Sequence, residues 1–383
     1  MNSSRVKKFS WIILASSTLT VMAGSIIGPV VREISIGLDV DPSFAGLIIT
    51  MHGLFVFLFS PLAGSIIDRL GVRYALSAGL LLYGLSGGIG LIIGSYFPLL
   101  LSRAFLGISV ALIFSSITTL ILNLYHGKGR NRMMGLRGSA NSLGAAVWPL
   151  VGGVLGTVSW HLPFGVYLVG LPLGLLSLVY MPRVRRSSEE KGGSVFSIFR
   201  TNPVLFAIYS LMFAINLLLY VNIVYLPQIL GNIGVKSTFK VSLFFSTLGV
   251  TAALTASQYD KLKEKLNYLG ILQISFLLWS TGFGLIFLTS SLWIYGLAVA
   301  LFGTGQGIML PTAMLWLGDV ISPSFLGRFS SYLTTFGYLG QFLTPVLFGH
   351  ISQSMDVDSV FLISSLVSIT CLVLSILPKN LKN

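Results

Sequence analysis

The charged stretch at residues 64–73 reads Gly64-Ser65-Ile66-Ile67-Asp68-Arg69-Leu70-Gly71-Val72-Arg73, and it separates two long apolar runs. The run from Gly46 to Ile67 holds one titratable residue, His52, and the run from Tyr74 to Ser102 holds no charged residue. Because the connecting segment is so short, we expect a charged loop that joins two antiparallel, neighbouring helices.

The composition places the chain in a membrane. Of its 383 residues, 54% are hydrophobic and 9% are charged, whereas soluble domains contain about 25% charged residues. A soluble protein of this composition could not cover its own surface, so we expect the bilayer to be its solvent. The single cysteine, Cys371, excludes an internal disulfide, and the four histidines lack metal-ligand spacing, so we expect no metal site and no cofactor.

Twelve apolar spans of about 20 residues can be counted along the chain. They are 10–31, 43–67, 75–95, 97–124, 135–158, 162–181, 202–230, 238–258, 266–289, 291–317, 325–351 and 358–377. The charged, Ser/Gly-rich segment 182–200 interrupts the series. We therefore predict an all-α membrane protein with an N-terminal six-helix half at 1–181, a cytoplasmic linker at 182–200 and a C-terminal half at 201–383.

The positive charge is distributed as membrane orientation requires. The formal net charge is +13, but the basic residues lie in short loops between apolar runs, which argues against nucleic acid as a partner. Twenty of the 24 Lys and Arg residues lie on the side of the termini, three (Arg32, Lys236 and Lys240) lie on the other side, and Arg103 lies inside a span. This asymmetry predicts a multi-pass protein of the cell (plasma or inner) membrane with both termini in the cytoplasm.

The two halves repeat each other at a nearly constant offset of 191–196 residues. The matching landmarks are Gly64-x-x-x-Asp68-Arg69 with Ala256-x-x-x-Asp260-Lys261, Gly107 with Gly303, Pro149 with Pro345, and Arg137 with Arg328. Duplicated halves with a site between them are typical of secondary transporters.

The pattern Gly-x-x-x-Asp-Arg-x-Gly-x-Arg at residues 64–73 resembles the loop between helices 2 and 3 of the major facilitator superfamily. The resemblance implies twelve transmembrane helices in two pseudo-symmetric six-helix halves. It also implies alternating-access transport of a small-molecule substrate by a monomer in the lipid bilayer. The chain has no Gly-x-x-x-x-Gly-Lys-Ser/Thr motif, so we expect an ion gradient, carried by protons, to supply the energy.

The charged residues near the helix 2–3 segment are expected to form a gate. Asp68 can pair with Arg137 and, by the resemblance, faces span 11 when the cytoplasmic side is closed. The alternative is a solvated surface loop. The residues predicted to take part in gating are Gly64, Asp68, Arg69, Gly71, Arg73, Arg137, Asp260, Asp319 and Arg328. We expect Asp319 to form a cluster with Arg328 and Lys261.

Arg103 is the basic residue inside a span, and a guanidinium there must be paired or hydrated. The spacing of Arg103 and Gly107 resembles a span 4 motif of this superfamily that is associated with proton coupling. The alternative is that the Arg103 side chain extends to the outer surface of the membrane. None of the eleven acids lies in the middle of a span, Glu33 included, and the drug–proton antiporters' acid in span 1 is missing. His52 is the proposed substitute, unless it is a packing residue.

Span 5 matches the antiporter motif of the superfamily in part. Pro149 and Gly152-Gly153 agree with the motif, while Trp148 replaces a glycine. Ordinary tight helix packing is the alternative explanation. At the end of span 4, Asn123 stands where the family often has an acid, and the second-half equivalent is Asp319.

Amide and aromatic side chains in the spans predict a mostly apolar pocket with few polar anchors. The candidate substrate-binding residues are Arg103, Asn141, Trp148, Asn216, Tyr220, Gln306, Tyr338 and Gln341. The leading hypothesis is proton-coupled export of a small amphipathic compound, with His52 and Arg103 coupling protons. The alternative is an organic-anion transporter that uses Arg103 as the binding cation. A membrane enzyme is disfavoured because no paired carboxylates or clustered histidines are present, and a sensor because no soluble domain is present.

Overall fold

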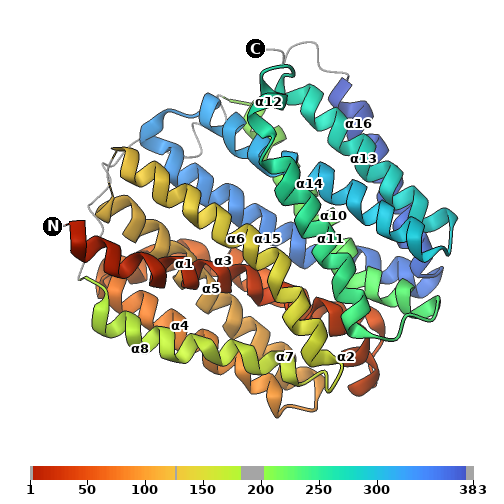
Figure 1. The fold of residues 1–383 in the computed structure, drawn as a ribbon, viewed down its shortest axis with the longest axis horizontal. Helices are drawn as coiled ribbons and strands as arrows, with labels where there is room; N and C mark the ends of the chain where they lie inside the picture. Colours follow the sequence, from red (N-terminus) through yellow and green to blue (C-terminus); the bar gives the residue numbers. More distant parts are fainter. Residues whose placement is uncertain (1–2, 126, 183–201, 377–383) are drawn as a thin grey trace. The chain divides into compact units, whose positions relative to one another are not determined.

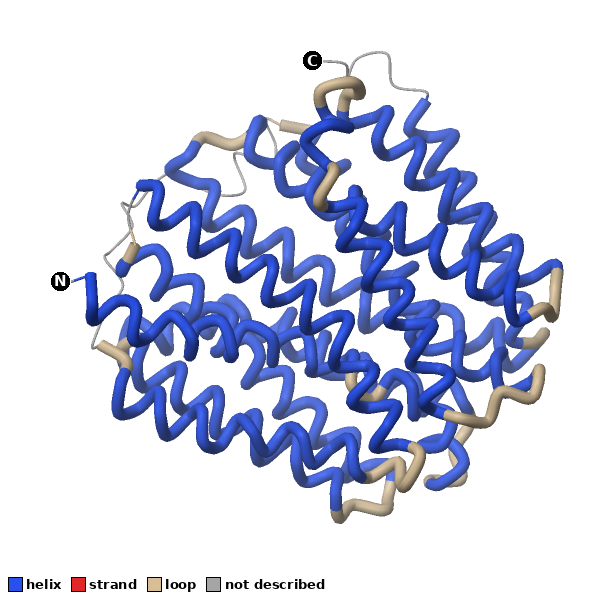
Figure 2. Tube along the Cα trace, in the orientation of Figure 1, coloured by secondary structure: helices blue, strands red, loops and turns tan. Residues whose placement is uncertain are grey.

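The computed structural model describes residues 3–125, 127–182 and 202–376, and in these ranges all regular structure is helical (Figure 2). Apart from Pro182, the predicted linker at 182–200 lies outside the described residues. The helices of the first half are α1 (Ser3–Ser25), η1 (Gly28–Val30), α2 (Val31–Gly37), α3 (Pro42–Leu70), α4 (Val72–Gly88), η2 (Ile89–Leu91), α5 (Tyr96–Leu124), α6 (Gly127–Gly156), α7 (Leu162–Gly165), η3 (Val166–Val169) and α8 (Gly170–Tyr180).

The second half repeats this order of long helices. Its elements are α10 (Val204–Asn232), α11 (Thr238–Ala256), α12 (Tyr259–Lys263), α13 (Tyr268–Leu288), α14 (Leu292–Val320), α15 (Pro323–Ser354) and α16 (Val357–Ile376). Within the described residues, ten helical segments are long and apolar enough to cross a membrane. The 30-residue α6 and the 32-residue α15 are more polar and complete the twelve predicted spans.

The chain divides into two compact units, Met1–Glu190 with Ser237–Ser242 (unit 1) and Lys191–Lys236 with Leu243–Asn383 (unit 2). The two units use the same helix pairs. In unit 1, α1 packs on α6, and α4 packs on α5 and α8, with α8 alongside α4 in Figure 1. In unit 2, α10 packs on α15, and α13 packs on α14 and α16. The internal repeat in the sequence is therefore also a repeat of the packing.

The segment 64–73 is more helical than the sequence analysis predicted. Residues up to Leu70 belong to α3 and residues from Val72 belong to α4, so Gly71 is the one non-helical residue between them. Its φ of 83° lies in the left-handed region, which a glycine adopts without steric cost. The prediction of a charged loop here was wrong, and the chain reverses direction at a single glycine.

The first span is longer than predicted and is not one continuous helix. The apolar segment runs over Phe9–Gly37, but α1 ends at Ser25, and a short 3-10 turn containing Pro29 leads into α2. A proline cannot donate a backbone hydrogen bond, so it is tolerated where one helix ends and the next begins. Glu33 therefore lies inside the first apolar span, where the sequence analysis had placed no acid.

Candidate functional site

Arg103 is fully buried in the interior of unit 1. It lies on α5, is 0% exposed, and its Nη2 donates hydrogen bonds to the carbonyl oxygens of Ser86 (3.0 Å) and Gly87 (2.9 Å). Both carbonyls lie in the last turn of α4, where they have no donor within the helix and carry the negative end of the helix dipole. The end of α4 thus supplies the counter-charge that the sequence analysis could not find for Arg103.

Aromatic rings surround the rest of the guanidinium. Its central carbon lies 5.0 Å from the ring centre of Phe164 and 5.1 Å from that of Tyr167, both in the α7–η3 segment. The Tyr167 hydroxyl interacts with Arg103 and donates to the Ala23 carbonyl on α1 (2.7 Å), and Tyr83 donates to the Leu19 carbonyl (2.6 Å). Arg103, Tyr83, Phe164 and Tyr167, here called the Arg103 cluster, connect four elements of unit 1.

His52 lies next to this cluster. It is 1% exposed on α3, and its backbone carbonyl lies so close to Gly107 on α5 that a Cβ atom there would overlap it. Gly107 follows Arg103 by one helical turn, and His52 and Arg103 are near enough to interact electrostatically. The two residues predicted to couple protons therefore lie near each other, an imidazole beside a buried guanidinium, and their role stays a prediction.

The predicted gate residues of the first half do not all meet. Asp68 and Arg69 are exposed in the last turn of α3, and Gly64 and Arg73 are partly exposed. Arg137 is buried on α6 and faces α5, where its Nη1 donates to the Thr118 hydroxyl (2.9 Å) and its guanidinium lies 4.4 Å from the Phe114 ring centre. The hydrogen bond to Thr118 and the contact with Phe114 thus connect α6 to α5. The pairing of Asp68 with Arg137 stays a prediction.

In the second half, an aromatic group holds Asp319. The Tyr268 hydroxyl donates to the Asp319 carboxylate (2.5 Å), while the Lys263 ammonium lies 3.4 Å from the Tyr268 ring centre. Tyr268 also stacks on Trp316. The described partner of Asp319 is thus a tyrosine. The predicted cluster of Asp319 with Lys261 and Arg328 stays a prediction, because the side chain of Arg328 lies outside the described side chains. Asp260 is exposed on α12.

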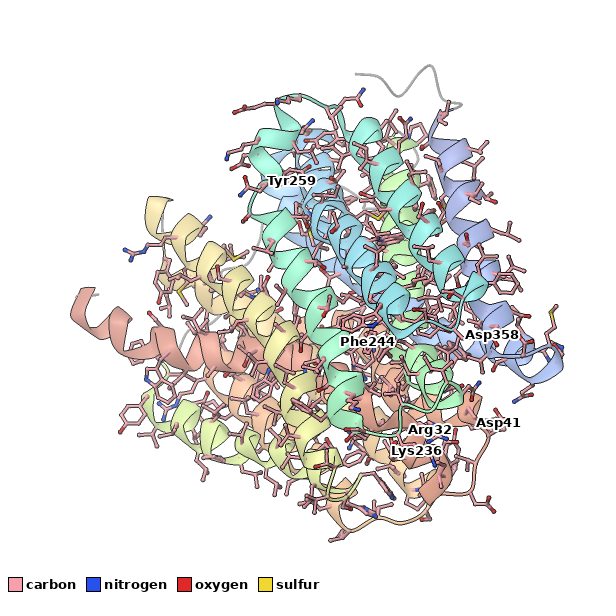
Figure 3. The ribbon with its side chains drawn as sticks, turned by 45° about the vertical axis from the view of Figure 1, so that its right-hand side comes forward. Arg32, Asp41, Lys236, Phe244, Tyr259 and Asp358 are labelled. Atoms are coloured by element: carbon pink, nitrogen blue, oxygen red, sulfur yellow. The ribbon has the colours of Figure 1, made fainter. Side chains whose placement is uncertain are left out.

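Tyr259 fixes the short helix α12 in unit 2 (labelled in Figure 3). Its hydroxyl shares a hydrogen bond of 3.0 Å with Thr312, and its ring packs against Ile271 and Ile308. Burial raises the pKa of the Tyr259 hydroxyl, so it stays protonated at neutral pH. The sequence analysis missed Tyr259, Tyr268 and Lys263. Tyr259 and Lys263 lie close to Asp260 in the sequence, and these residue types distinguish the segment from its first-half copy around Asp68.

The candidate pocket residues are divided between the units. In unit 1, Trp148 donates to the Thr18 carbonyl on α1 (3.2 Å), and Asn141, about two turns earlier on α6, is partly buried. In unit 2, Asn216 on α10 donates to the Met212 carbonyl (3.0 Å) and touches Gly337 on α15. The remaining candidates in unit 2 are buried or partly buried: Tyr220, Gln306, Tyr338 and Gln341. Asn141 and Gln306 each keep a buried side-chain oxygen without a described hydrogen-bond partner.

The glycines of α6 allow close approach of other helices. A Cβ atom at Gly152 would overlap the Ile26 carbonyl, and one at Gly156 would overlap the Val30 side chain. Gly153 faces the first turns of α11, where the Thr238 hydroxyl donates to the Gly153 carbonyl (2.7 Å). The glycines of the predicted span 5 motif therefore lie at helix contacts, as small residues commonly do in membrane helices, and what the motif implies for the direction of transport stays a prediction.

Known proteins resemble the chain in sequence and in fold. A family model described as Major Facilitator Superfamily matches residues 13–272 and 226–382. The Multidrug efflux protein YfmO of Bacillus subtilis (strain 168) is 27% identical over 186 residues, 48% of this chain and 47% of the relative. The Quinolone resistance protein NorA of Staphylococcus aureus is 27% identical over 142 residues, 37% of this chain and 36% of the relative. The chain spans about half, or less, of the length of these curated relatives.

Two solved structures share the fold at low sequence identity. A bacterial homologue of the human lysosomal transporter Spinster, in an inward-facing and unoccupied conformation, gives a TM-score of 0.79 at 16% identity and covers 98% of this chain and 96% of its own. A D-xylose–proton symporter gives a TM-score of 0.78 at 14% identity and covers 96% and 97%. At these identities the similarity concerns the fold alone.

Proposed function

Because the chain belongs to the major facilitator superfamily and is therefore a membrane transporter, we propose that it exports a small amphipathic organic compound in exchange for protons. Several relatives are named for multidrug efflux or drug resistance, which supports export of drug-like compounds. The span 5 motif supports the same direction. We further propose that both termini lie in the cytoplasm and that 1–181 and 201–383 are the moving halves, joined by the linker 182–200.

The observation that carries the proton coupling is the position of His52. The buried imidazole of His52 lies where α3 contacts α5 at Gly107, which is one helical turn after Arg103. The Arg103 cluster in turn spans α4, α5 and the α7–η3 segment. Protonation of His52 would put a second positive charge beside a buried guanidinium, at a cost of several kcal/mol by order of magnitude at low dielectric. The charge state of His52 is thereby linked to the packing of these helices, which is what proton-driven alternating access requires.

The surroundings of Arg103 favour a positioning role over the organic-anion alternative. Its Nη2 donates to carbonyl groups at the end of α4, its Nε donates to the Ser102 hydroxyl (3.3 Å), and Phe164 and Tyr167 cover the guanidinium. Nη1 is buried without a hydrogen-bond partner among the described residues. We therefore propose that Arg103 positions α4 and α5 and sets the environment of His52, rather than binding the substrate directly.

The test is proton flux in sealed liposomes that contain the purified protein, with a panel of lipophilic cations and organic anions at a set pH gradient. We expect lipophilic cations to drive proton movement and His52→Ala to abolish it. His350→Ala is the matched control, because His350 is exposed on α15. Proton movement with anions alone, retained in His52→Ala, would replace export of amphipathic cations by anion transport.

Arg103→Met separates the two roles of Arg103. It keeps the length of the side chain but removes three hydrogen bonds from a charged donor, so we expect a loss of about 3 kcal/mol of stability. Thermal unfolding of the protein in detergent measures this loss. A variant of unchanged stability that no longer binds organic anions, measured by calorimetry, would contradict the positioning role and favour a binding cation.

A further inference from the structure

The end of unit 2 at which α13 begins and α14 ends holds two aromatic rings and a carboxylate. Tyr268 is the first residue of α13, and Trp316 lies in the last turns of α14. Their rings are nearly parallel, with 5.8 Å between the ring centres and 18° between the ring planes. The Tyr268 hydroxyl donates a hydrogen bond to Asp319, which follows Trp316 by about one helical turn. Tyr268, Trp316 and Asp319, here called the Tyr268 site, thus connect two helices.

A cation of the chain itself lies on the Tyr268 ring. The ammonium of Lys263, the last residue of α12, is 3.4 Å from the ring centre, well inside the range of about 6 Å over which an aromatic face attracts a cation. Tyr259, labelled in Figure 3, fixes α12 through its hydrogen bond to Thr312 and so brings Lys263 to this position. The Tyr268 site is therefore built in a way that holds an ammonium group.

The Lys263 ammonium can be exchanged for another cation. A lysine ammonium is strongly hydrated and is carried on a flexible stem, so it regains its water when it leaves the ring. Lys263 and Tyr268 are both partly exposed, and Asp319 is exposed. An organic cation with apolar substituents is more weakly hydrated, and it also removes apolar surface from water when it packs on a ring. The exchange therefore favours an organic cation over the lysine.

Space for a larger group is present beside the Tyr268 site. A Cβ atom at Gly318, which lies between Trp316 and Asp319 on α14, would lie in open space, with no atom of another described element within 4 Å. The Trp316 ring is buried and offers a rigid apolar surface, while the Asp319 carboxylate attracts a positive charge. Two rings, a carboxylate and open space are together the features by which proteins recognise organic cations.

Unit 1 has neither a ring nor a carboxylate at the equivalent positions of the repeat. At an offset of 196 residues, the equivalents of the Tyr268 site are Val72, Leu120 and Asn123. The connection between the helices also differs, because Gly71 alone separates α3 from α4, whereas the short helix α12 lies between α11 and α13. The shared fold of the two halves therefore does not require the Tyr268 site, and its residues are free to serve a binding role.

We propose that the Tyr268 site binds an organic cation at the cytoplasmic end of unit 2, and that this cation displaces the Lys263 ammonium from the Tyr268 ring. The ligand class is a lipophilic or quaternary ammonium or phosphonium ion. The exchange is non-covalent and moves no proton. The assignment rests on the proposed function, in which amphipathic compounds leave the cytoplasm, and it makes the Tyr268 site the place where such a cation first contacts the protein.

Displacement of Lys263 can be measured on the purified wild-type protein without transport. Tetraphenylphosphonium is the probe, and triphenylphosphine oxide, an uncharged compound of similar shape, is its control. Reductive methylation of each lysine amine is followed by mass spectrometry of the peptides. We expect tetraphenylphosphonium to raise the methylation rate of Lys263 several-fold and to leave the rates of Lys261 and Lys265, which are exposed, unchanged. Triphenylphosphine oxide should change none of the three rates.

Substitutions test the same site through the Kd of tetraphenylphosphonium, measured by calorimetry. We expect Lys263→Gln to bind the probe about three- to tenfold more tightly, because the competing ammonium is gone, and Lys261→Gln, the matched control, to bind as the wild type does. Trp316→Leu and Asp319→Asn should each weaken binding about tenfold. A role of Lys263 in stability alone does not predict tighter binding when its charge is removed.

The outcomes separate the Tyr268 site from the proposed function. Methylation of Lys263 that stays unchanged at every concentration of tetraphenylphosphonium would overturn the site and leave the proposed function intact, as would equal affinity in Lys263→Gln and the wild type. An equal response of Lys263 to triphenylphosphine oxide would overturn the assignment of a cation as the ligand. Displacement of Lys263 by tetraphenylphosphonium, without proton flux driven by this cation in liposomes, would overturn the proposed function and retain the site.

Discussion

The Arg103 cluster of unit 1 and its counterpart in unit 2 occupy the same position in the internal repeat but have opposite chemistry. At an offset of 196 residues, Val299 takes the place of Arg103. In the helix group α13, α14 and α16 of the same unit lies an aromatic cluster made of Trp279, Phe283, Phe302 and Phe361. Trp279 stacks on Phe302 with 4.6 Å between ring centres, and Phe283 contacts Phe302 (5.2 Å) and Phe361 (6.2 Å). At this position of the repeat, unit 1 has a buried cation, whereas unit 2 has a valine and an aromatic cluster.

The backbone geometry beneath this difference is the same. Gly107 of α5 lies against the His52 carbonyl of α3, and Gly303 of α14 lies against the Leu248 carbonyl of α11. Two helices thus cross at a glycine in each unit, and the side chains nearby are free to differ. The comparison teaches that a buried histidine and a buried arginine lie near the crossing in unit 1, while the crossing in unit 2 involves Leu248 and Thr251, which do not titrate, so we expect the proton chemistry to belong to unit 1.

The largest effect is expected from Val299→Arg, which gives unit 2 the cation of unit 1. Val299 is fully buried on α14, three residues before Phe302 of the aromatic cluster. An unpaired guanidinium there should cost several kcal/mol, enough to prevent folding. The loss of folded protein is measured as the yield of monodisperse protein in size-exclusion chromatography after membrane extraction.

Val299→Met is the matched control for this substitution, because it lengthens the side chain without adding a charge. We expect it to cost about 1–3 kcal/mol by overpacking and to leave folded protein. A normally folded Val299→Arg protein would mean that unit 2 also offers partners for a cation, and the contrast between the units would be lost.

An intermediate and equal effect is expected from Gly107→Ala and Gly303→Ala. In both units the new Cβ atom would overlap a backbone carbonyl of the crossing helix, so the helices must separate. We expect each variant to lose about 1–3 kcal/mol of stability. Thermal unfolding in detergent measures both, and Gly94→Ala, at a site with open space, is the control. A loss in one unit and none in the other would show that the two crossings are not equivalent.

The sequence was sufficient to predict the twelve spans, because apolar runs separated by charged segments are a strong signal in a membrane protein. Prediction was least accurate where the break in a span is local. The reversal at Gly71 depends on one backbone conformation, and the break after Ser25 depends on how the 3-10 turn Gly28–Val30 packs against α6. Hydropathy predicts neither feature, and Glu33 was therefore placed outside the first predicted span, 10–31.

The surroundings of Arg103 could not be predicted for a different reason. A search for a carboxylate partner fails, because the partners are the main-chain carbonyls of Ser86 and Gly87, which have no sequence signature. Phe164 and Tyr167 lie in the irregular α7–η3 segment, where helical periodicity does not tell which way a side chain points. In contrast, His52 was expected at a depth similar to that of Arg103 in its span, and the structure places the two residues close enough to interact electrostatically.

The smallest effect is expected from Tyr83→Phe and Trp279→Phe, the pair of equivalent hydrogen-bond donors in the two clusters. Tyr83 donates to the Leu19 carbonyl (2.6 Å), and Trp279 donates to the Phe302 carbonyl (2.9 Å). Each substitution keeps an aromatic ring and removes one hydrogen bond, so each protein should lose about 0.6–1.5 kcal/mol of stability, measured by thermal unfolding.

The measurement that distinguishes the two substitutions is the pH profile of transport. Tyr83 interacts electrostatically with Arg103, so Tyr83→Phe should displace the profile, while Trp279→Phe, surrounded by uncharged rings, should leave it in place. Equal displacement by both substitutions would show that proton coupling is shared between the units, against the division of chemistry argued from Arg103 and Val299.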